Sequence, residues 1–306
     1  MNEKSAFDKG KRISMYELIQ VSERCFYIQS PAKIGVVLTG ENQVCLIDSG
    51  NDKDAGKKVK KILDAKGWTL QAIYNTHSHA DHIGGNQYLQ KQTGCRVYAA
   101  GIERDFTEHP LLEPSFLFGA NPPNDLRHKF LMAQSSDVLP LTADCLPAGW
   151  QILPLPGHSW DMVGFRTTDG VIYLADCLSS KETLEKYQVS FLVDAQTYLE
   201  TLEAIQHVEA NIFIPAHAEP TDNIIPLAQC NIRKVHEIAD VLLQICKKPS
   251  SFEIILKQLF DHYQLTMNFE QYVLVGSTVR SYLTWLKEQG RLRADFVENT
   301  MVWVNE

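Results

Sequence analysis

The stretch THSHADHIGGN, residues 76–86, decides how the rest of the chain is interpreted. It places His77, His79 and His82, three of the chain's ten histidines, within six residues, together with Asp81. Imidazole and carboxylate groups are the ligands that zinc and similar divalent metals prefer. The stretch therefore indicates part of a metal site. The alternative is a polar loop between a strand and a helix, in which Asp81 caps the helix.

Length and composition bound the class of protein. The 306 residues suffice for two domains, or for one large domain with an appendage. A net charge of −8 argues against nucleic acid as the default partner. No apolar run is long enough to span a bilayer, and the first residues, MNEKSAFDKGKR, lack the apolar middle of a signal peptide. Seven scattered cysteines without C-x-x-C spacing are typical of a reduced protein, so we expect cytoplasmic localisation and no membrane partner.

Strand-like and helix-like segments alternate as far as residue 217. Strands are expected, from their apolar or alternating residues, in the ranges 36–48 (a pair), 70–77, 95–100, 150–156, 162–168, 171–176 and 211–217. Helices are expected, from apolar residues at helical spacing, in the ranges 57–65, 86–94 and 195–207. This alternation predicts an α/β domain in which helices cover sheets.

The segment 105–140 breaks the alternation. It is rich in prolines and phenylalanines: Phe106, Pro110, Pro114, Phe116, Phe118, Pro122, Pro123, Phe130 and Pro140. We expect an insertion of low regularity. Two interpretations stay open: a surface loop packed by its own aromatic side chains, or a functional element that forms a lid over a substrate pocket or a dimer contact.

Beyond about residue 225 the pattern becomes mainly helical. Helices are expected in the ranges 232–245, 251–263 and 277–289, and Ser250 with Glu253 has the spacing of a capping box for the second of them. A hairpin that turns at Glu298 and Asn299 is expected to follow. Three helices and a hairpin are the outline of a winged-helix module. We therefore divide the chain into a catalytic domain, 1–224, and a smaller C-terminal domain, 225–306.

Further candidate ligands stand at the ends of other strand-like runs. The complete set is His77, His79, Asp81, His82, His158, Asp176 and His217. Taken singly, His158 or His217 would usually be a surface histidine, and Asp176 a turn residue. Seven such groups are too many for one metal and suit two metals that share a carboxylate. Loops that follow strands of a sheet can bring them to one point.

The spacing in residues 77–82 resembles the H-x-H-x-D-H signature of the metallo-β-lactamase superfamily, and the resemblance covers about residues 15–220. It implies a four-layer αβ/βα sandwich with a dinuclear metal site at one edge. It also implies that His77, His79 and His158 hold the first metal. Asp81, His82 and His217 would hold the second metal, and Asp176 would bridge the two.

The aspartate at position 176 indicates which branch of the superfamily the chain resembles. The commonest zinc β-lactamases put a cysteine at the second metal and lack this aspartate, so the ligand set looks more like that of glyoxalase II-type hydrolases. Cys177 is expected to be a buried small apolar residue. Flavodiiron-type oxidoreductases carry an acidic residue where this chain has His79, which argues against redox chemistry. Gly84 and Gly85 are expected to let the backbone turn tightly into the next helix.

The resemblance implies a metallo-hydrolase that acts on a small acyl substrate: a thioester, an ester or a lactone. Two divalent metal ions, first of all zinc and otherwise iron or manganese, would hold a bridging hydroxide as the nucleophile. Asp81 is the expected catalytic residue, because its carboxylate could orient the nucleophile and move its proton.

Two alternatives stay open. One is a metal-dependent phosphodiesterase or endoribonuclease on single-stranded RNA, since the tail resembles that of the β-lactamase-like endoribonuclease branch. Residues 221–306, however, carry nine lysines and arginines against ten aspartates and glutamates, so nucleic acid is not the expected partner. The other is a binding protein without catalysis, which has little need for seven metal ligands. A homodimer is considered for the oligomeric state.

Overall fold

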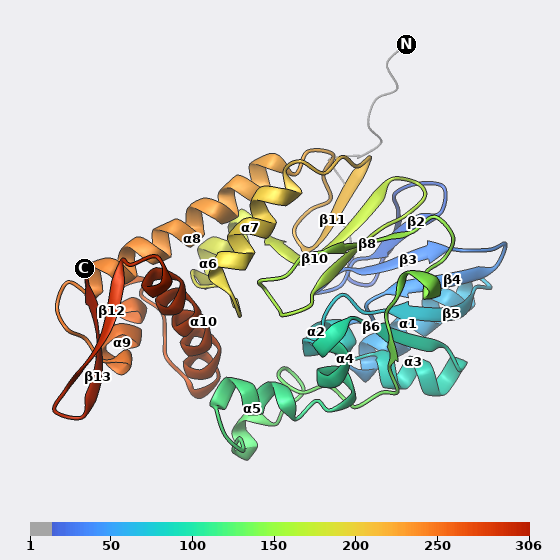
Figure 1. The fold of residues 1–306 in the computed structure, drawn as a ribbon. Coiled ribbons are helices and arrows are strands. Elements are labelled where there is room, and N and C mark those ends of the chain that lie inside the picture. Colours follow the sequence, from blue (N-terminus) through green and yellow to red (C-terminus); the bar gives the residue numbers. More distant parts are fainter. Residues whose placement is uncertain (1–13) are drawn as a thin grey trace, which may run out of the picture.

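The computed structural model describes residues 14–306 and contains two main β-sheets that lie between helices (Figure 1). The first sheet has its strands in sequence order: β1 (Leu18–Gln20), β2 (Cys25–Ile28), β3 (Ile34–Leu38), β4 (Gln43–Ile47), β5 (Thr69–Tyr74), β6 (Arg96–Ala99) and β7 (Leu139–Pro140). Pairing is antiparallel from β1 to β4 and parallel from β4 to β7. The segment judged not to be a signal peptide, residues 1–12, lies outside the described residues.

The second sheet has the strand order β11-β10-β9-β8. Its strands are β8 (Gln151–Pro154), β9 (Val163–Arg166), β10 (Val171–Ser179) and β11 (Ile212–His217). The helices up to residue 217 are α1 (Lys53–Ala65), α2 (Ala80–Ile83), α3 (Asn86–Thr93), α4 (Gly101–Glu108), α5 (Leu112–Phe118), α6 (Lys181–Tyr187) and α7 (Ala195–Ile205). The tail adds α8 (Ile225–Ile245), α9 (Phe252–His262), α10 (Phe269–Glu288) and the hairpin β12 (Leu292–Val297) with β13 (Thr300–Asn305).

Three clusters of buried apolar side chains hold the layers together. On the outer face of the first sheet, Val59 of α1 and Leu89 of α3 pack with the strand residues. The two sheets meet through residues such as Val37 and Phe165. On the outer face of the second sheet, Leu202 of α7 belongs to a cluster that also includes α8. The order helix, sheet, sheet, helix confirms the predicted four-layer α/β sandwich.

Helix starts differ from the predictions because of their caps. α1 begins at Lys53, ahead of the predicted range, since the Asp52 side chain accepts hydrogen bonds from the amides of Asp54 and Ala55. α10 begins at Phe269 rather than near residue 277, because the Asn268 side chain caps the helix there by accepting a hydrogen bond from the Gln271 amide. The predicted capping box at the start of α9 is wrong. The cap position there is residue 251, which makes no side-chain cap bond.

The prediction of low regularity for the segment 105–140 is wrong for its first part. The end of α4 and the whole of α5 lie in it, followed by a 3-10 turn at Asn124–Leu126 and the short strand β7. Pro114 is no obstacle to α5, since it stands in the first turn, where a missing amide hydrogen costs little. The segment packs against the tail: Leu117, Leu126 and Leu131 form a buried cluster with Val273 of α10.

Gly84 and Gly85 serve a different purpose from the predicted one. Their φ values are −61° and −85°, which any residue can adopt, so no glycine-specific turn is needed. Space is the constraint. A Cβ atom on Gly84 would lie 2.3 Å from the carbonyl carbon of Asn51, and one on Gly85 would lie 2.3 Å from the carbonyl oxygen of Ser49. The glycines therefore allow the loop after β4 to approach the start of α3 closely.

The tail has the predicted outline of three helices and a hairpin. Glu298 and Asn299 form the predicted turn and have φ values of 47° and 61°, as a two-residue hairpin turn requires. One buried cluster extends from the second sheet through α7 and α8 to α9 and α10, so the tail shares a core with the sandwich. The domain boundary after residue 224 stays a prediction. Within residues 14–306, no helix is long and apolar enough to cross a membrane.

We expect Gly84→Ala to lower the free energy of unfolding by about 3 kcal/mol, because the new methyl group overlaps backbone atoms that cannot move independently. Gly276→Ala is the matched control. It lies inside α10, where the nearest atoms to a new Cβ are 3.4 Å or more away, and alanine favours a helix more than glycine does. Urea unfolding measures both variants. Equal stability of the two would contradict the close approach at Gly84.

Candidate metal centre

All seven predicted ligands come together at one edge of the sandwich. The chain leaves β5 and delivers His77 and His79, and the short helix α2 carries Asp81 and His82. The remaining three come from the second sheet: His158 follows β8, Asp176 lies on β10, and His217 ends β11. Asp176 was predicted at the end of a strand. It lies inside β10 instead, beside a register shift where Ala175 has a φ of 51°.

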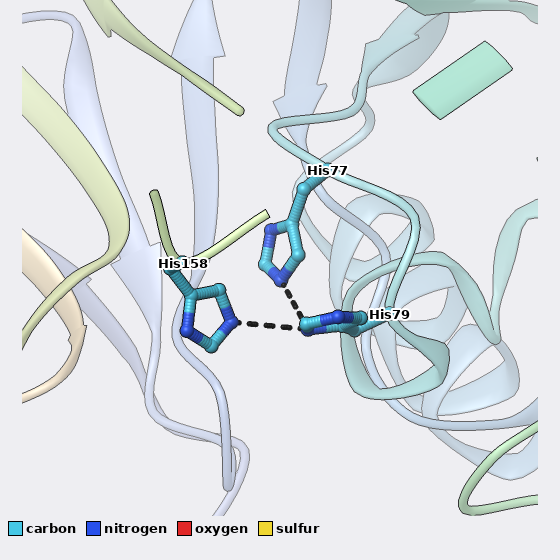
Figure 2. Close-up of side chains that lie close together, drawn as sticks. All are labelled: His77, His79 and His158. Atoms are coloured by element: carbon cyan, nitrogen blue, oxygen red, sulfur yellow. Dashed lines mark hydrogen bonds between the residues drawn. The ribbon is translucent and has the colours of Figure 1, made fainter. Parts of the chain in front are cut away.

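His77, His79 and His158 form the first group (Figure 2). His77 Nε2 and His158 Nε2 each lie 3.0 Å from His79 Nδ1. We call this group the histidine trio. Figure 2 shows the three rings converging from two loops, one with His77 and His79 and the other with His158.

Asp81, His82, Asp176 and His217 form the second group. His82 Nε2 lies 3.0 Å from Asp176 Oδ1, and His217 Nε2 lies 3.2 Å from Asp176 Oδ2 and 3.4 Å from Asp81 Oδ2. Asp176 Oδ2 also lies 3.5 Å from His158 Nε2 of the trio. The carboxylate of Asp176 therefore stands between the two groups.

Outer partners fix the directions of the histidine rings. His158 Nδ1 donates to the carbonyl of Phe191 at 3.0 Å, so in the neutral ring Nε2 carries a lone pair that points inward. His77 Nδ1 lies 3.0 Å from Thr76 Oγ1, whose own hydrogen goes to Asp48 at 2.8 Å. His77 therefore also directs a lone pair inward. Two lone pairs that face one His79 nitrogen cannot both be satisfied by a single hydrogen.

The second group has a similar deficit. His82 Nε2 and Asp176 Oδ1 are buried and make no hydrogen bond, although they lie 3.0 Å apart. Buried polar atoms normally have a partner, and unsatisfied ones are costly. A divalent cation would accept the inward lone pairs of the trio and, after displacing any proton on His82, those of His82 and Asp176 in the second group. Imidazole and carboxylate donors are those that zinc, iron and manganese take. The residues therefore fit two metal ions.

Burial governs the charge of the histidine trio. It lowers the pKa of His77 well below the usual range and lowers the pKa values of His79 and His158 to about 4. These rings are therefore neutral at pH 7 and need lose no proton to bind a metal.

The second group has the opposite character. Burial works against its charges, but Asp176, Asp81 and Asp48 together hold the pKa of His82 well above the usual range. Asp176 and Asp81 likewise raise the pKa of His217 to about 10. The two imidazolium groups in turn hold the pKa of Asp176 well below its usual range and that of Asp81 at about 2, despite burial. Without metal, this group is a network of ion pairs.

Three carboxylates near the site were not predicted from the sequence. Asp48, at the end of β4, accepts from Thr76 N at 2.8 Å and lies 2.7 Å from His82 Nδ1. Glu103 of α4 accepts from Ser78 N at 2.9 Å and from Asp161 N at 3.1 Å, and also from the hydroxyl of Ser159. It thereby ties the loop of His77 and His79 to the loop of His158.

The third carboxylate comes from the segment 105–140. Glu113 Oε1, on α5, lies 3.7 Å from His79 Nε2, the nitrogen that faces away from the trio's centre. Burial, and then the charge of Glu103, raises the pKa of Glu113 to about 8. A cation on His79 would favour the ionised carboxylate, as outer carboxylates of metal-bound histidines do. No motif marks Glu113 in the sequence, but the end-of-strand position of Asp48 is a signal that could have been used.

Comparison with known proteins assigns the chain to a protein family. The family model described as "Metallo-beta-lactamase superfamily" matches residues 34–217, more than half of the chain. A crystal structure of a β-lactamase domain protein from Burkholderia ambifaria matches with a TM-score of 0.75 and 16% identity, over 97% of each chain. At that identity the likeness shows the fold alone. The chain belongs to the metallo-β-lactamase superfamily.

Two named relatives match parts of the chain. A hydroxyacylglutathione hydrolase of Rhodopseudomonas palustris is 35% identical over 130 residues, 42% of each chain. The probable metallo-hydrolase YflN of Bacillus subtilis is 23% identical over 218 residues, 64% of this chain and 80% of YflN. The chain spans less than half the length of the hydroxyacylglutathione hydrolases that it matches.

Metal uptake by the second group must displace the protons on His82 and His217, whereas uptake by the trio displaces none at neutral pH. Both raised pKa values lie above the usual 6.5, so binding at the second group strengthens as the pH rises from about 6 to about 8, by about tenfold per pH unit for each displaced proton. Calorimetric titration of the metal-free protein in buffers of different ionisation enthalpy counts the released protons.

His217→Ala should reduce that number, and His77→Ala should leave it unchanged. Metal uptake that releases no proton at pH 7 would show that His82 and His217 are already neutral in the metal-free protein.

Proposed function

We propose that the chain is a dinuclear metallo-hydrolase that cleaves a small acyl substrate: a thioester, an ester or a lactone. The observation that carries the proposal is the position of Asp176 between two ligand groups, one neutral and one charged. Its glyoxalase II-like ligand set and the partial matches to hydroxyacylglutathione hydrolases support an acyl compound as substrate. Because the candidate ligands are imidazoles and carboxylates, zinc is the first metal to test.

The ligands His158, Asp176 and His217 open into a cavity of about 750 Å³. Its walls come from the β2–β3 loop, α6 and α10, so a small substrate can reach the centre from that side. Val189, Phe191 and Val275 give part of this wall an apolar surface.

Two bound divalent ions would lower the pKa of a shared water and polarise the substrate carbonyl. The chain's own residues do the rest. Asp81, ionised at neutral pH, can accept a hydrogen bond from the attacking water at Oδ2 and fix its direction. Asp48 and Glu103 hold the ligand loops in register, so little rearrangement is needed during the reaction.

The endoribonuclease alternative finds less support. A winged-helix tail that binds RNA would need free basic side chains. The two arginines near the hairpin pair with carboxylates, Arg293 with Asp295 at 2.7 Å and Arg291 with Asp240 at 3.5 Å. We propose that the winged-helix-like tail has a structural role beside the active site. The homodimer and the cytoplasmic compartment stay predictions.

Asp176→Ala and His79→Ala should each reduce hydrolysis to the background rate and lower the bound metal from two ions per chain to one or none, because each removes a ligand that no neighbour replaces. His207→Ala, an exposed histidine at the end of α7, is the matched control and should change neither quantity. Elemental analysis, followed by parallel assays on a thioester, a lactone, a β-lactam and a phosphodiester, measures the outcome. Full activity of a metal-depleted Asp176→Ala protein would contradict the proposed function.

A further inference from the structure

A buried lysine lines the same cavity as the proposed metal ligands. Lys33 lies in the loop between β2 and β3 and is only 8% exposed. It shares the cavity wall with Asp176 and His217. No sequence motif marks Lys33, and it is not one of the seven candidate ligands.

The loop after β11 holds Lys33 in place. Its Nζ donates to the carbonyl of Ala218 at 2.6 Å, and its backbone amide donates to the carbonyl of Ala216 at 3.2 Å. Ala216 and Ala218 flank His217, so the ammonium is fixed beside the second ligand group. An ammonium carries three hydrogens, and the Ala218 carbonyl takes one of them.

No carboxylate forms an ion pair with Lys33 among residues 14–306. The Tyr27 ring lies 5.9 Å from Nζ, and Glu219, also in the cavity wall, is exposed and acts on Lys33 only at longer range. Burial lowers the pKa of the Lys33 amine, as expected for a desolvated cation. Buried charges in proteins are normally paired, because desolvation is otherwise uncompensated. Within residues 14–306, the other two ammonium hydrogens of Lys33 thus make no hydrogen bond.

The opposite end of the centre is apolar. The ring of Phe191 lies 5.2 Å from that of His79 and 5.9 Å from that of His158, measured between centroids. Leu274 of α10 lines the cavity together with Phe191. The cavity therefore has an apolar wall at the histidine trio and a cation beside His217.

We propose that Lys33 binds a carboxylate of the substrate, and that the natural substrate is an acyl compound with a free carboxylate at a distance from the scissile carbonyl. The inference rests on the proposed function. A carboxylate matches one ammonium with two free hydrogens, whereas a phosphate dianion usually recruits further cations. The bound carboxylate would orient the substrate with its apolar part toward Phe191.

The test compares two S-phenyl thioesters on the zinc-loaded protein: that of glutaric acid, and an analogue in which an isopropyl group replaces the carboxylate. The wild-type protein should prefer the glutaryl thioester by at least about tenfold in kcat/KM, the range expected for a hydrogen bond to a charged group. Lys33→Met should remove this preference, mainly through KM, and leave the neutral thioester within about twofold. Lys186→Met, which changes an exposed lysine at the rim of the cavity, should keep the preference.

A wild-type protein without the preference would overturn the proposal, as would a Lys33→Met protein that loses activity equally toward both thioesters. If the wild-type protein cleaves neither thioester faster than the Asp176→Ala protein does, the proposed thioesterase function is wrong. The carboxylate site at Lys33 is then tested by glutarate binding alone. Calorimetric binding of glutarate to the wild type that is lost in Lys33→Met supports the carboxylate site. Binding that is equal in both proteins, or absent from both, overturns it.

Discussion

The carboxylate of Asp48 is the contact on which both ligand groups depend. This carboxylate accepts hydrogen bonds from the amide and the hydroxyl of Thr76, and it lies 2.7 Å from His82 Nδ1. Through Thr76 it directs His77 toward the trio, and through its own oxygen it directs His82 toward Asp176. Rings held in this way keep their inner nitrogens aimed at the centre without a metal. In the trio this has a cost, since the buried lone pairs of His77 and His158 face the same His79 nitrogen until a cation binds.

The ligands themselves could be predicted from the sequence because histidine is scarce and strand ends converge in a layered fold. Glu103 and Glu113 could not be predicted with the same reasoning, because each contacts the site across a long stretch of sequence and a carboxylate on a helix has no local signature. Asp48 follows a strand, as several of the ligands do, so its position could have been used as a signal. The position of Asp176 inside β10 was missed for a related reason: its direction comes from a backbone irregularity at Ala175, which propensities do not encode.

Much of the fold followed from periodicity, and the errors concentrated at helix starts and in the segment 105–140. Side-chain caps at Asp52 and Asn268 lengthened two helices beyond their apolar pattern. In the inserted segment, α5 is stabilised by tertiary packing on α10, with Leu117 in the cluster that contains Val273. The tail and the insertion thus meet where α5 lies against the end of α10 (Figure 1), and residues of both line a small cavity together with His79 and Asp81. We propose that substrate selection by this chain depends on the loops around the cavity rather than on the metal ligands.

The central claim is that seven side chains form two metal sites joined by Asp176. Anomalous X-ray diffraction from crystals of the metal-loaded protein, recorded on both sides of the metal's absorption edge, tests it most directly. We expect two anomalous peaks per chain, one within the histidine trio and one among Asp81, His82 and His217, with an oxygen of Asp176 directed at each. A single peak, or two peaks neither of which contacts Asp176, would contradict the account.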